Sequence, residues 1–288
     1  MTPPTSVPTS PPRTGPVRLR PLTSRGPQLR ASFWGGLRAE WIKLRTMRST
    51  LFLVLGIVAF CAGLAALNGT SAGDDYAGLS PADRATFDPL AISLRGYLLA
   101  QIALGLLGGL VITAEYGSRT ISTTVMAVPR RGRVLVAKAL VLALVAAAAG
   151  FLVSLVGFLV GQASLAAKDA PHLALTDSLA VRGIGGGTVY LALAALFGLA
   201  IGTMIRSTTA TVTTLFGVML IVQAFAPALP GALGDRVMKY WPSIAGGQVI
   251  TGYRDPALLG PWAGLGVMGA CVAVLMTAAF IVFLKRDA

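Results

Sequence analysis

Long apolar runs dominate the pattern of hydrophobic and polar positions along this chain. Six of them lack Asp, Glu, Lys and Arg and are long enough for a membrane-spanning helix, which needs about 20 mainly apolar residues. The runs are continuous rather than alternating, which favours helices over the strands of a membrane barrel. The sequence predicts an all-α polytopic membrane protein with six transmembrane helices, at about 50–68, 97–114, 139–161, 187–205, 209–226 and 262–284.

The segment 1–32 differs sharply from the rest of the chain. It holds eight of the 17 prolines, together with Ser, Thr and Arg, a composition that cannot bury a core. We interpret it as a disordered Pro/Arg-rich cytoplasmic tail. It has no apolar stretch before Phe33, so we expect no secretory signal and a first span that stays in the membrane.

A helical pattern begins at residue 33 and continues to residue 48. Apolar residues recur there at spacings of three and four, whereas Arg38, Lys43 and Arg45 lie off that face. This pattern predicts an amphipathic helix in the membrane interface, with its tryptophans at headgroup depth. The alternative is a merely basic lead-in to the six-span domain at 49–288. The apolar face consists of Phe33, Trp34, Leu37, Trp41 and Leu44.

The distribution of charged residues predicts how the chain is oriented in the membrane. Only 12% of the 288 residues are charged, against roughly 25% in soluble domains, which excludes an ordinary soluble protein. With the N-terminus inside, seventeen of the 24 Lys and Arg residues but three of the 11 acids fall on the inner side. Basic residues near span ends are retained in the cytoplasm. The net charge of +13 therefore indicates that both termini are cytoplasmic, and it requires no nucleic-acid partner.

Several kinds of chemistry lack the residues they need. The two cysteines lie in apolar runs and the single histidine, His172, has no partner ligands nearby, so we expect no metal site. No Lys follows a Gly, which excludes the phosphate-binding loop of common ATPases. The predicted spans also lack the interior charges of a proton relay. We therefore expect no catalytic residues and no bound cofactor, and any work that the protein does would have to be driven from outside the membrane.

The predicted inner loop at 115–138 is the most informative segment. A carboxylate at the end of the second span would meet the unfavourable end of that helix dipole, but it would be stabilised in the first turn of a new helix. We therefore expect Glu115 to begin a short cytoplasmic helix that reaches about Val128 and is stopped by Pro129.

The loop reads Glu-Tyr-x-x-x-Thr-Ile-x-x-Thr from Glu115 and Pro-x-Arg-Gly-Arg-Val-x-x-x-Lys from Pro129. With the interfacial helix and six spans, it resembles the type-2 ATP-binding-cassette (ABC) transporter permeases, especially small bacterial export permeases. The resemblance covers about 33–288. It implies a permease that forms a homodimer or pairs with a related permease, and that docks two separate ATPase subunits through this loop, called the coupling helix. ATP and Mg²⁺ would bind to those partners.

The resemblance also implies which residues couple the permease to the ATPase. This chain has Arg119 where the family often has Gly, so the local turn and its contact with the ATPase can differ. The implied cargo is an amphipathic drug, peptide or lipid-like compound. The coupling residues carried over are Glu115, Tyr116, Arg119, Thr120, Pro129, Arg131 and Arg133.

Polar residues within the spans have two interpretations, contact with a substrate or hydrogen bonds between helices. The candidates for a substrate path are Gln101, Thr203, Gln223 and Trp241. Trp241 lies in the apolar outer segment 227–261, where the resemblance implies short re-entrant helices. Glycines four residues apart, such as Gly105 with Gly109 and Gly198 with Gly202, favour packing within the bundle over a dimer seam, although 34 glycines also produce such pairs by chance.

Two other classes of protein remain open. A membrane anchor or signalling protein would have no ATPase partner. A secondary carrier would transport its substrate with an ion gradient after ATP is depleted.

Overall fold

The computed structural model describes residues 33–46, 48–117 and 131–285. Within these ranges the chain is helical and has no strand. Six of the helices are long and apolar enough to cross a membrane, which confirms the predicted fold class. The elements in chain order are α1 (Phe33–Thr46), α2 (Arg48–Tyr76), α3 (Pro81–Ala85), α4 (Pro89–Ser93), α5 (Tyr97–Gly117), α7 (Arg131–Ala166), α8 (Ser178–Ile205), α9 (Thr208–Phe216), η1 (Gly217–Ile221), α10 (Val222–Phe225), η2 (Ala226–Ala228), α11 (Gly231–Tyr240), α12 (Pro242–Gly247), η3 (Gln248–Ile250) and α13 (Pro261–Lys285).

Each predicted span lies inside an observed helical segment, which for the span at 209–226 consists of several consecutive elements, and the observed segments are longer. Helix α2 continues to Tyr76 and α7 begins at Arg131, eight residues before the predicted start at 139. A search for charge-free windows ends a span at the first charged residue, whereas the backbone hydrogen bonds of a helix continue through it. The charged residues Glu115 and Lys138, which bound predicted spans, are consequently inside long helices.

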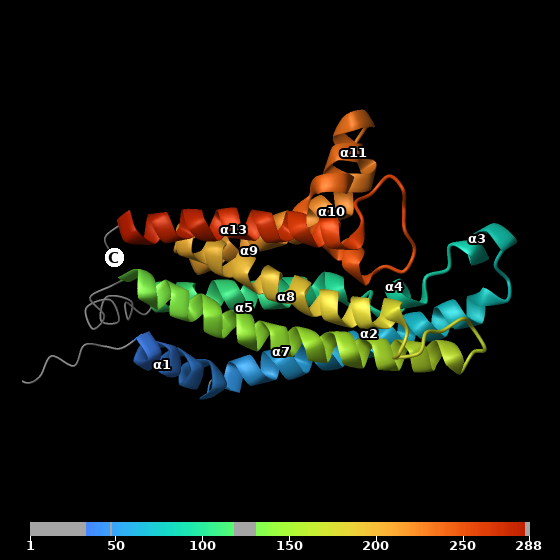
Figure 1. The fold of residues 1–288 in the computed structure, drawn as a ribbon, viewed down its shortest axis with the longest axis horizontal. Coiled ribbons are helices and arrows are strands. Elements are labelled where there is room, and N and C mark those ends of the chain that lie inside the picture. The colour runs from blue at the N-terminus through green and yellow to red at the C-terminus, as the bar shows by residue number, and fades with distance from the viewer. Residues whose placement is uncertain (1–32, 47, 118–130, 286–288) are drawn as a thin grey trace, which may run out of the picture. The chain divides into compact units, whose positions relative to one another are not determined.

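Helix α8 contacts α5, α7, α9 and α13 (Figure 1). Its approach to α5 depends on glycine. A Cβ atom added at Gly198 would lie 1.8 Å from the carbonyl oxygen of Gly105, and one added at Gly108 would lie 1.9 Å from that of Ala195. Only a residue without a side chain allows the two backbones to come so close. The glycines of these two spans therefore pack within the bundle, as predicted for Gly105 and Gly198.

The fifth span is not a regular α-helix. Between α9 and α10, five residues form the π-helix η1, and the N–H group of Val222 bonds to the carbonyl of Gly217, five residues earlier. A π turn leaves neighbouring carbonyls free for other donors. The span predicted at 209–226 is confirmed as Thr208–Ala228. Its π turn has no counterpart in the sequence prediction, because the apolar pattern of a π turn does not differ from that of an α-helix.

Short helices follow in the segment 227–261, where the resemblance implied them. Helix α12 packs closely on α13, since an added Cβ at Gly264 would lie 2.0 Å from the carbonyl oxygen of Ala245. In η3, the fully buried Val249 lies against Gly186 of α8. This part of the chain is thus folded onto the transmembrane helices.

The helix predicted over 33–48 is present as α1, and α2 starts after residue 47. The apolar face of α1 is buried at one residue and exposed at others. Leu44 is 4% exposed, whereas Trp34 is 74% and Trp41 38% exposed. Helix α1 packs against α7. Leu44 is buried within the helical bundle, whereas the two tryptophans are exposed on the surface of the protein. The tail at 1–32 lies outside the described residues.

Candidate functional site

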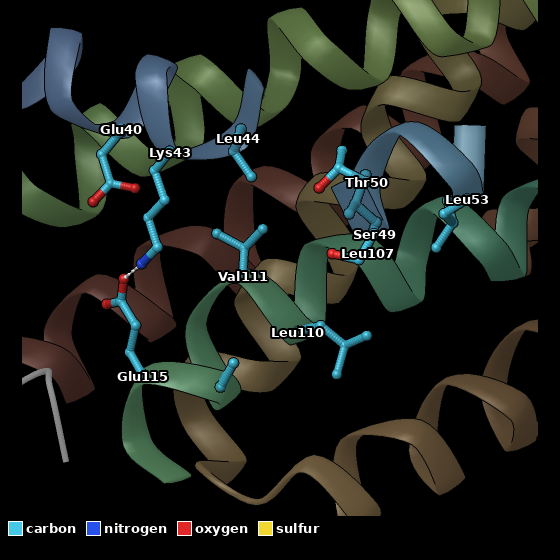
Figure 2. A pocket seen from close by; sticks show the side chains of 11 residues that line it. Glu40, Lys43, Leu44, Ser49, Thr50, Leu53, Leu107, Leu110, Val111 and Glu115 are labelled. Atoms are coloured by element: carbon cyan, nitrogen blue, oxygen red, sulfur yellow. Dashed lines mark hydrogen bonds and ion pairs between the residues drawn. The ribbon is translucent and has the colours of Figure 1, made fainter. Parts of the chain in front are cut away.

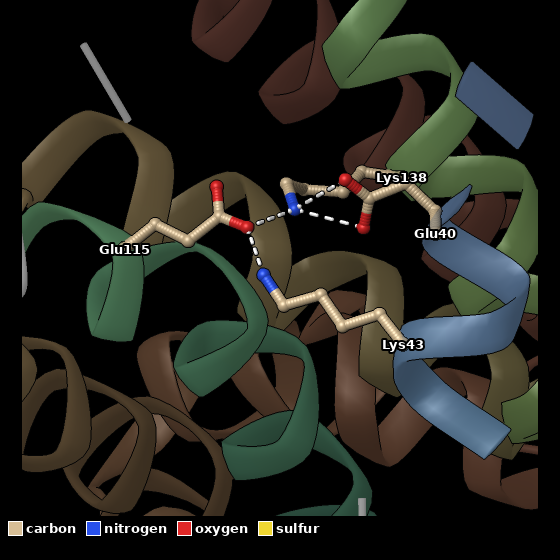
Figure 3. Close-up of polar contacts among 4 residues, drawn as sticks. All are labelled: Glu40, Lys43, Glu115 and Lys138. Carbon is tan, nitrogen blue, oxygen red and sulfur yellow. Dashed lines mark hydrogen bonds and ion pairs between the residues drawn. The ribbon is translucent and has the colours of Figure 1, made fainter. Parts of the chain in front are cut away.

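Four charged side chains from three helices meet where α5 ends and α7 begins (Figure 3). The ammonium group of Lys138 lies 2.6 Å from Oε1 of Glu115 and 2.9–3.0 Å from the two carboxylate oxygens of Glu40. Lys43 donates a further hydrogen bond to Glu115. The formal charges of these four residues, here called the charge cluster, sum to zero.

The cluster is largely shielded from solvent. The side chain of Lys138 is 1% exposed, that of Glu115 7% and that of Glu40 12%, while Lys43 is 45% exposed. Burying an ion costs several kcal/mol unless partners compensate it. Lys138 meets this condition because it is placed between two carboxylates from different helices.

Each helix contributes its charges at a defined position. Glu40 and Lys43 are three residues apart and therefore project from the same side of α1. Lys138 is in the second turn of α7. The carboxylates of Glu40 and Glu115 thus approach Lys138 from two other helices, and the three helices are tied together at one end (Figure 3).

The prediction that Glu115 begins a new helix is wrong. Helix α5 continues to Gly117, so Glu115 lies in its last turn. A carboxylate there is opposed by the helix dipole. The ammonium groups of Lys138 and Lys43 offset that repulsion, and neither contact is visible in the local sequence because the partners are 23 and 72 residues away.

The other predicted coupling residues have different positions. The guanidinium group of Arg206, at the end of α8, lies 5.0 Å from the centre of the Tyr116 ring, which is a cation–π contact. Arg133 is exposed on the first turn of α7, and Arg131 is its first residue. The predicted helix up to Val128 lies outside the described residues, as do Arg119, Thr120 and Pro129.

A cavity of about 240 Å³ adjoins the cluster (Figure 2). Glu40, Lys43 and Glu115 form its charged side. Its remaining walls are mainly apolar and come from α1, α2 and α5. They consist of Leu44, Ser49, Thr50, Leu53, Leu107, Leu110, Val111 and Ala114.

The predicted substrate-path residues form hydrogen bonds within the protein. Gln101 donates to the carbonyl of Met219 at 3.3 Å and to Oε1 of Gln223 at 3.1 Å, and it accepts a bond from Tyr190. Trp241 donates to the carbonyl of Val218 at 3.0 Å. Both carbonyls belong to the π turn.

Thr203 bonds to the carbonyl of Leu199 in its own helix, at 2.7 Å. The contacts of Gln101, Gln223 and Trp241 follow the second interpretation of the polar residues, hydrogen bonding between elements. A substrate contact at these side chains would have to compete with the bonds that they already make.

Glu40 was not among the predicted site residues, and Lys138 was recognised only as the last residue of a motif. One signal could have indicated Glu40. It is the single acid of the segment 33–48, and Lys43 follows it three residues later on the same side of the helix. Its pairing with Lys138, 98 residues away, has no counterpart in the local pattern.

Among residues 33–46, 48–117 and 131–285, no group of three or more His, Cys, Asp or Glu side chains is placed to hold a metal ion. A family model described as ABC-2 family transporter protein matches residues 36–223. That match includes the charge cluster, four of the six long helices and most of the fifth. No curated protein matches the chain.

Proposed function

This chain belongs to the ABC-2 transporter family, and from that premise we propose that it is the permease of an exporter driven by separate ATPase subunits. Family membership makes it a membrane-spanning transport subunit. The finer proposal covers the partner, the direction of transport and the cargo, which we expect to be an amphipathic drug, peptide or lipid-like compound. It also covers a bacterial inner-membrane location with cytoplasmic termini, and assembly as a homodimer or with a related permease.

The charge cluster is the observation that supports this proposal best. It joins α1 to α5 and α7, the two helices on either side of residues 118–130. A force applied to that loop by an ATPase would act on three helices at once, because pulling one away leaves buried charges without partners. ATP binding could then shift the permease between two conformations if the closed ATPase pair binds one of them more tightly.

The proposal predicts that ATPase activity co-purifies with the chain from its native cells in a mild detergent. Arg119→Ala should lose most of that activity, because it changes the proposed docking loop. Arg236→Ala, which alters an exposed residue of α11, should retain it. The measurement is ATP hydrolysis per mole of purified permease, with Glu115→Ala as a variant of the charge cluster and gel filtration as a check on folding.

Absence of ATPase activity from the wild-type preparation would contradict the proposed energy source. Transport assays distinguish an ATP-driven exporter from a secondary carrier. In inverted membrane vesicles, uptake of the cargo should stop when ATP is removed while the ion gradient is held. Uptake that continues under those conditions identifies a secondary carrier.

A further inference from the structure

A second hollow lies between α1 and α7 and does not include any residue of the charge cluster. It is a groove of about 460 Å³. Residues on successive turns of α1 form one side of the groove, and residues of α7 form the other side. The lining residues are Trp34, Leu37, Arg38 and Trp41 from α1, with Leu140, Val141 and Leu144 from α7.

The side of the groove formed by α7 is apolar and open to the surroundings. Leu140 is 53% and Leu144 59% exposed, although α7 is one of the most apolar membrane-spanning helices of the chain. Exposed leucines on such a helix face acyl chains, because lipid replaces water as the solvent there. Leu140 is seven residues beyond Arg133, which corresponds to about 10 Å along the helix.

The side formed by α1 has the character of the headgroup region. Trp34 and Trp41 are exposed, and tryptophan is enriched where the hydrocarbon meets the headgroups. Arg38 is exposed at the edge of the groove and is the one charged residue among its described lining residues. The nearest acid in the sequence, Glu40, is bonded to Lys138 and does not neutralise Arg38.

We propose that this groove binds one anionic phospholipid of the bilayer. The lipid phosphate pairs with the Arg38 guanidinium group, whose planar N–H groups match phosphate oxygens. An acyl chain runs along Leu140 and Leu144, and the tryptophans border the glycerol region. The bound lipid would therefore hold α1 against α7 at the groove, in addition to the ion pair between Glu40 and Lys138. This inference needs only the membrane embedding of the chain, and it does not depend on an ATPase.

The test uses the quenching of tryptophan fluorescence by brominated lipids. The full chain is reconstituted in nanodiscs of phosphatidylcholine that contain a small fraction of brominated phosphatidylglycerol, or of brominated phosphatidylcholine as the neutral probe. The contribution of Trp34 and Trp41 is obtained by difference from the variant in which both are Phe, since the chain has two further tryptophans. We expect stronger quenching by the anionic probe than by the neutral probe.

Arg38→Gln should lower the preference for the anionic probe about fivefold, the effect of one basic residue near an anionic surface. Arg45→Gln is the matched control, because Arg45 is exposed on the same helix but does not line the groove. This control should retain the preference. Inorganic phosphate at millimolar concentration should not displace the lipid, because it lacks the acyl chains.

Three results would overturn the proposal. Equal quenching of the wild type by both probes would show that the groove does not select a charge. Equal losses in Arg38→Gln and Arg45→Gln would assign the preference to the general surface charge of α1. Displacement by inorganic phosphate would identify a simple anion site. None of these results bears on co-purification of an ATPase, so this inference and the proposed function fail separately.

Discussion

The side chain of Lys138 is 1% exposed, and its ammonium group lies between the carboxylates of Glu115 and Glu40. A second Lys–acid pair of the protein is very different. Lys168 lies 2.7 Å from Asp74, with side chains that are 38% and 57% exposed. Exposed pairs of this kind contribute about 1 kcal/mol or less, because water screens them, whereas the loss of one partner from a buried pair costs several kcal/mol. A Lys–carboxylate pair is thus expected to matter more for the stability of the protein at Lys138 than at Lys168.

We predict that Lys138→Met lowers the free energy of unfolding by about 3–5 kcal/mol, because Glu40 then loses its cation and Glu115 keeps only the partly exposed Lys43. Lys168→Met should change it by about 1 kcal/mol or less. Thermal unfolding of both purified variants in the same detergent measures the difference. Equal shifts of the two midpoints would show that the charge cluster does not stabilise the fold.

At the scale of elements, the contact between α5 and α8 determines how the centre of the bundle is built. The two helices approach until glycine faces backbone at Gly108 and Gly198. In lipid, such close contact is favourable because van der Waals packing replaces the hydrophobic driving force that water would supply. Helix α8, which contains Gly198, also contains Gly185, where an added Cβ would have no atom within 4 Å.

Gly198→Ala should therefore destabilise the protein by roughly 1–3 kcal/mol or more, because the new methyl group forces α5 and α8 apart. Gly185→Ala should be neutral or slightly stabilising, since alanine favours a helix over glycine by about 0.5–1 kcal/mol. The two unfolding midpoints, measured in one detergent, test this comparison. A Gly198→Ala protein as stable as the wild type would mean that the helices are farther apart than described.

At the scale of the whole molecule, the distribution of basic residues supports the proposed orientation in the membrane. The side that carries the N-terminus holds most of the Lys and Arg residues and few acids, whereas the other side is almost balanced. Both Arg133, at the start of α7, and Ala85, in α3, are exposed and suit chemical labelling. They lie on opposite sides in the proposed topology.

We predict that a membrane-impermeant maleimide labels Ala85→Cys but not Arg133→Cys in right-side-out vesicles, with Cys61 and Cys271 replaced by Ala. Positive residues resist transfer across the membrane, which keeps Arg133 inside. Inverted vesicles are the control and should give the reverse pattern. Labelling of Arg133→Cys from the outside would place the proposed coupling loop on the wrong side for an ATPase.

The amino-acid sequence by itself determined that the chain is helical, that six helices can cross a membrane, and that an amphipathic helix precedes them. These features depend on local composition and periodicity, because about 20 apolar residues suffice for a span whatever they contact. The loop motif also indicated the family, which the family model then confirmed.

Only the tertiary structure decided which side chains meet. It placed Glu115 in the last turn of α5, paired Glu40 with Lys138 and put a π turn beside Gln101 and Trp241. It also left a groove between α1 and α7. The physical reason is that a buried charge or a free carbonyl is stabilised by whichever group packing brings near. Here those groups are between 23 and 122 positions away in the chain.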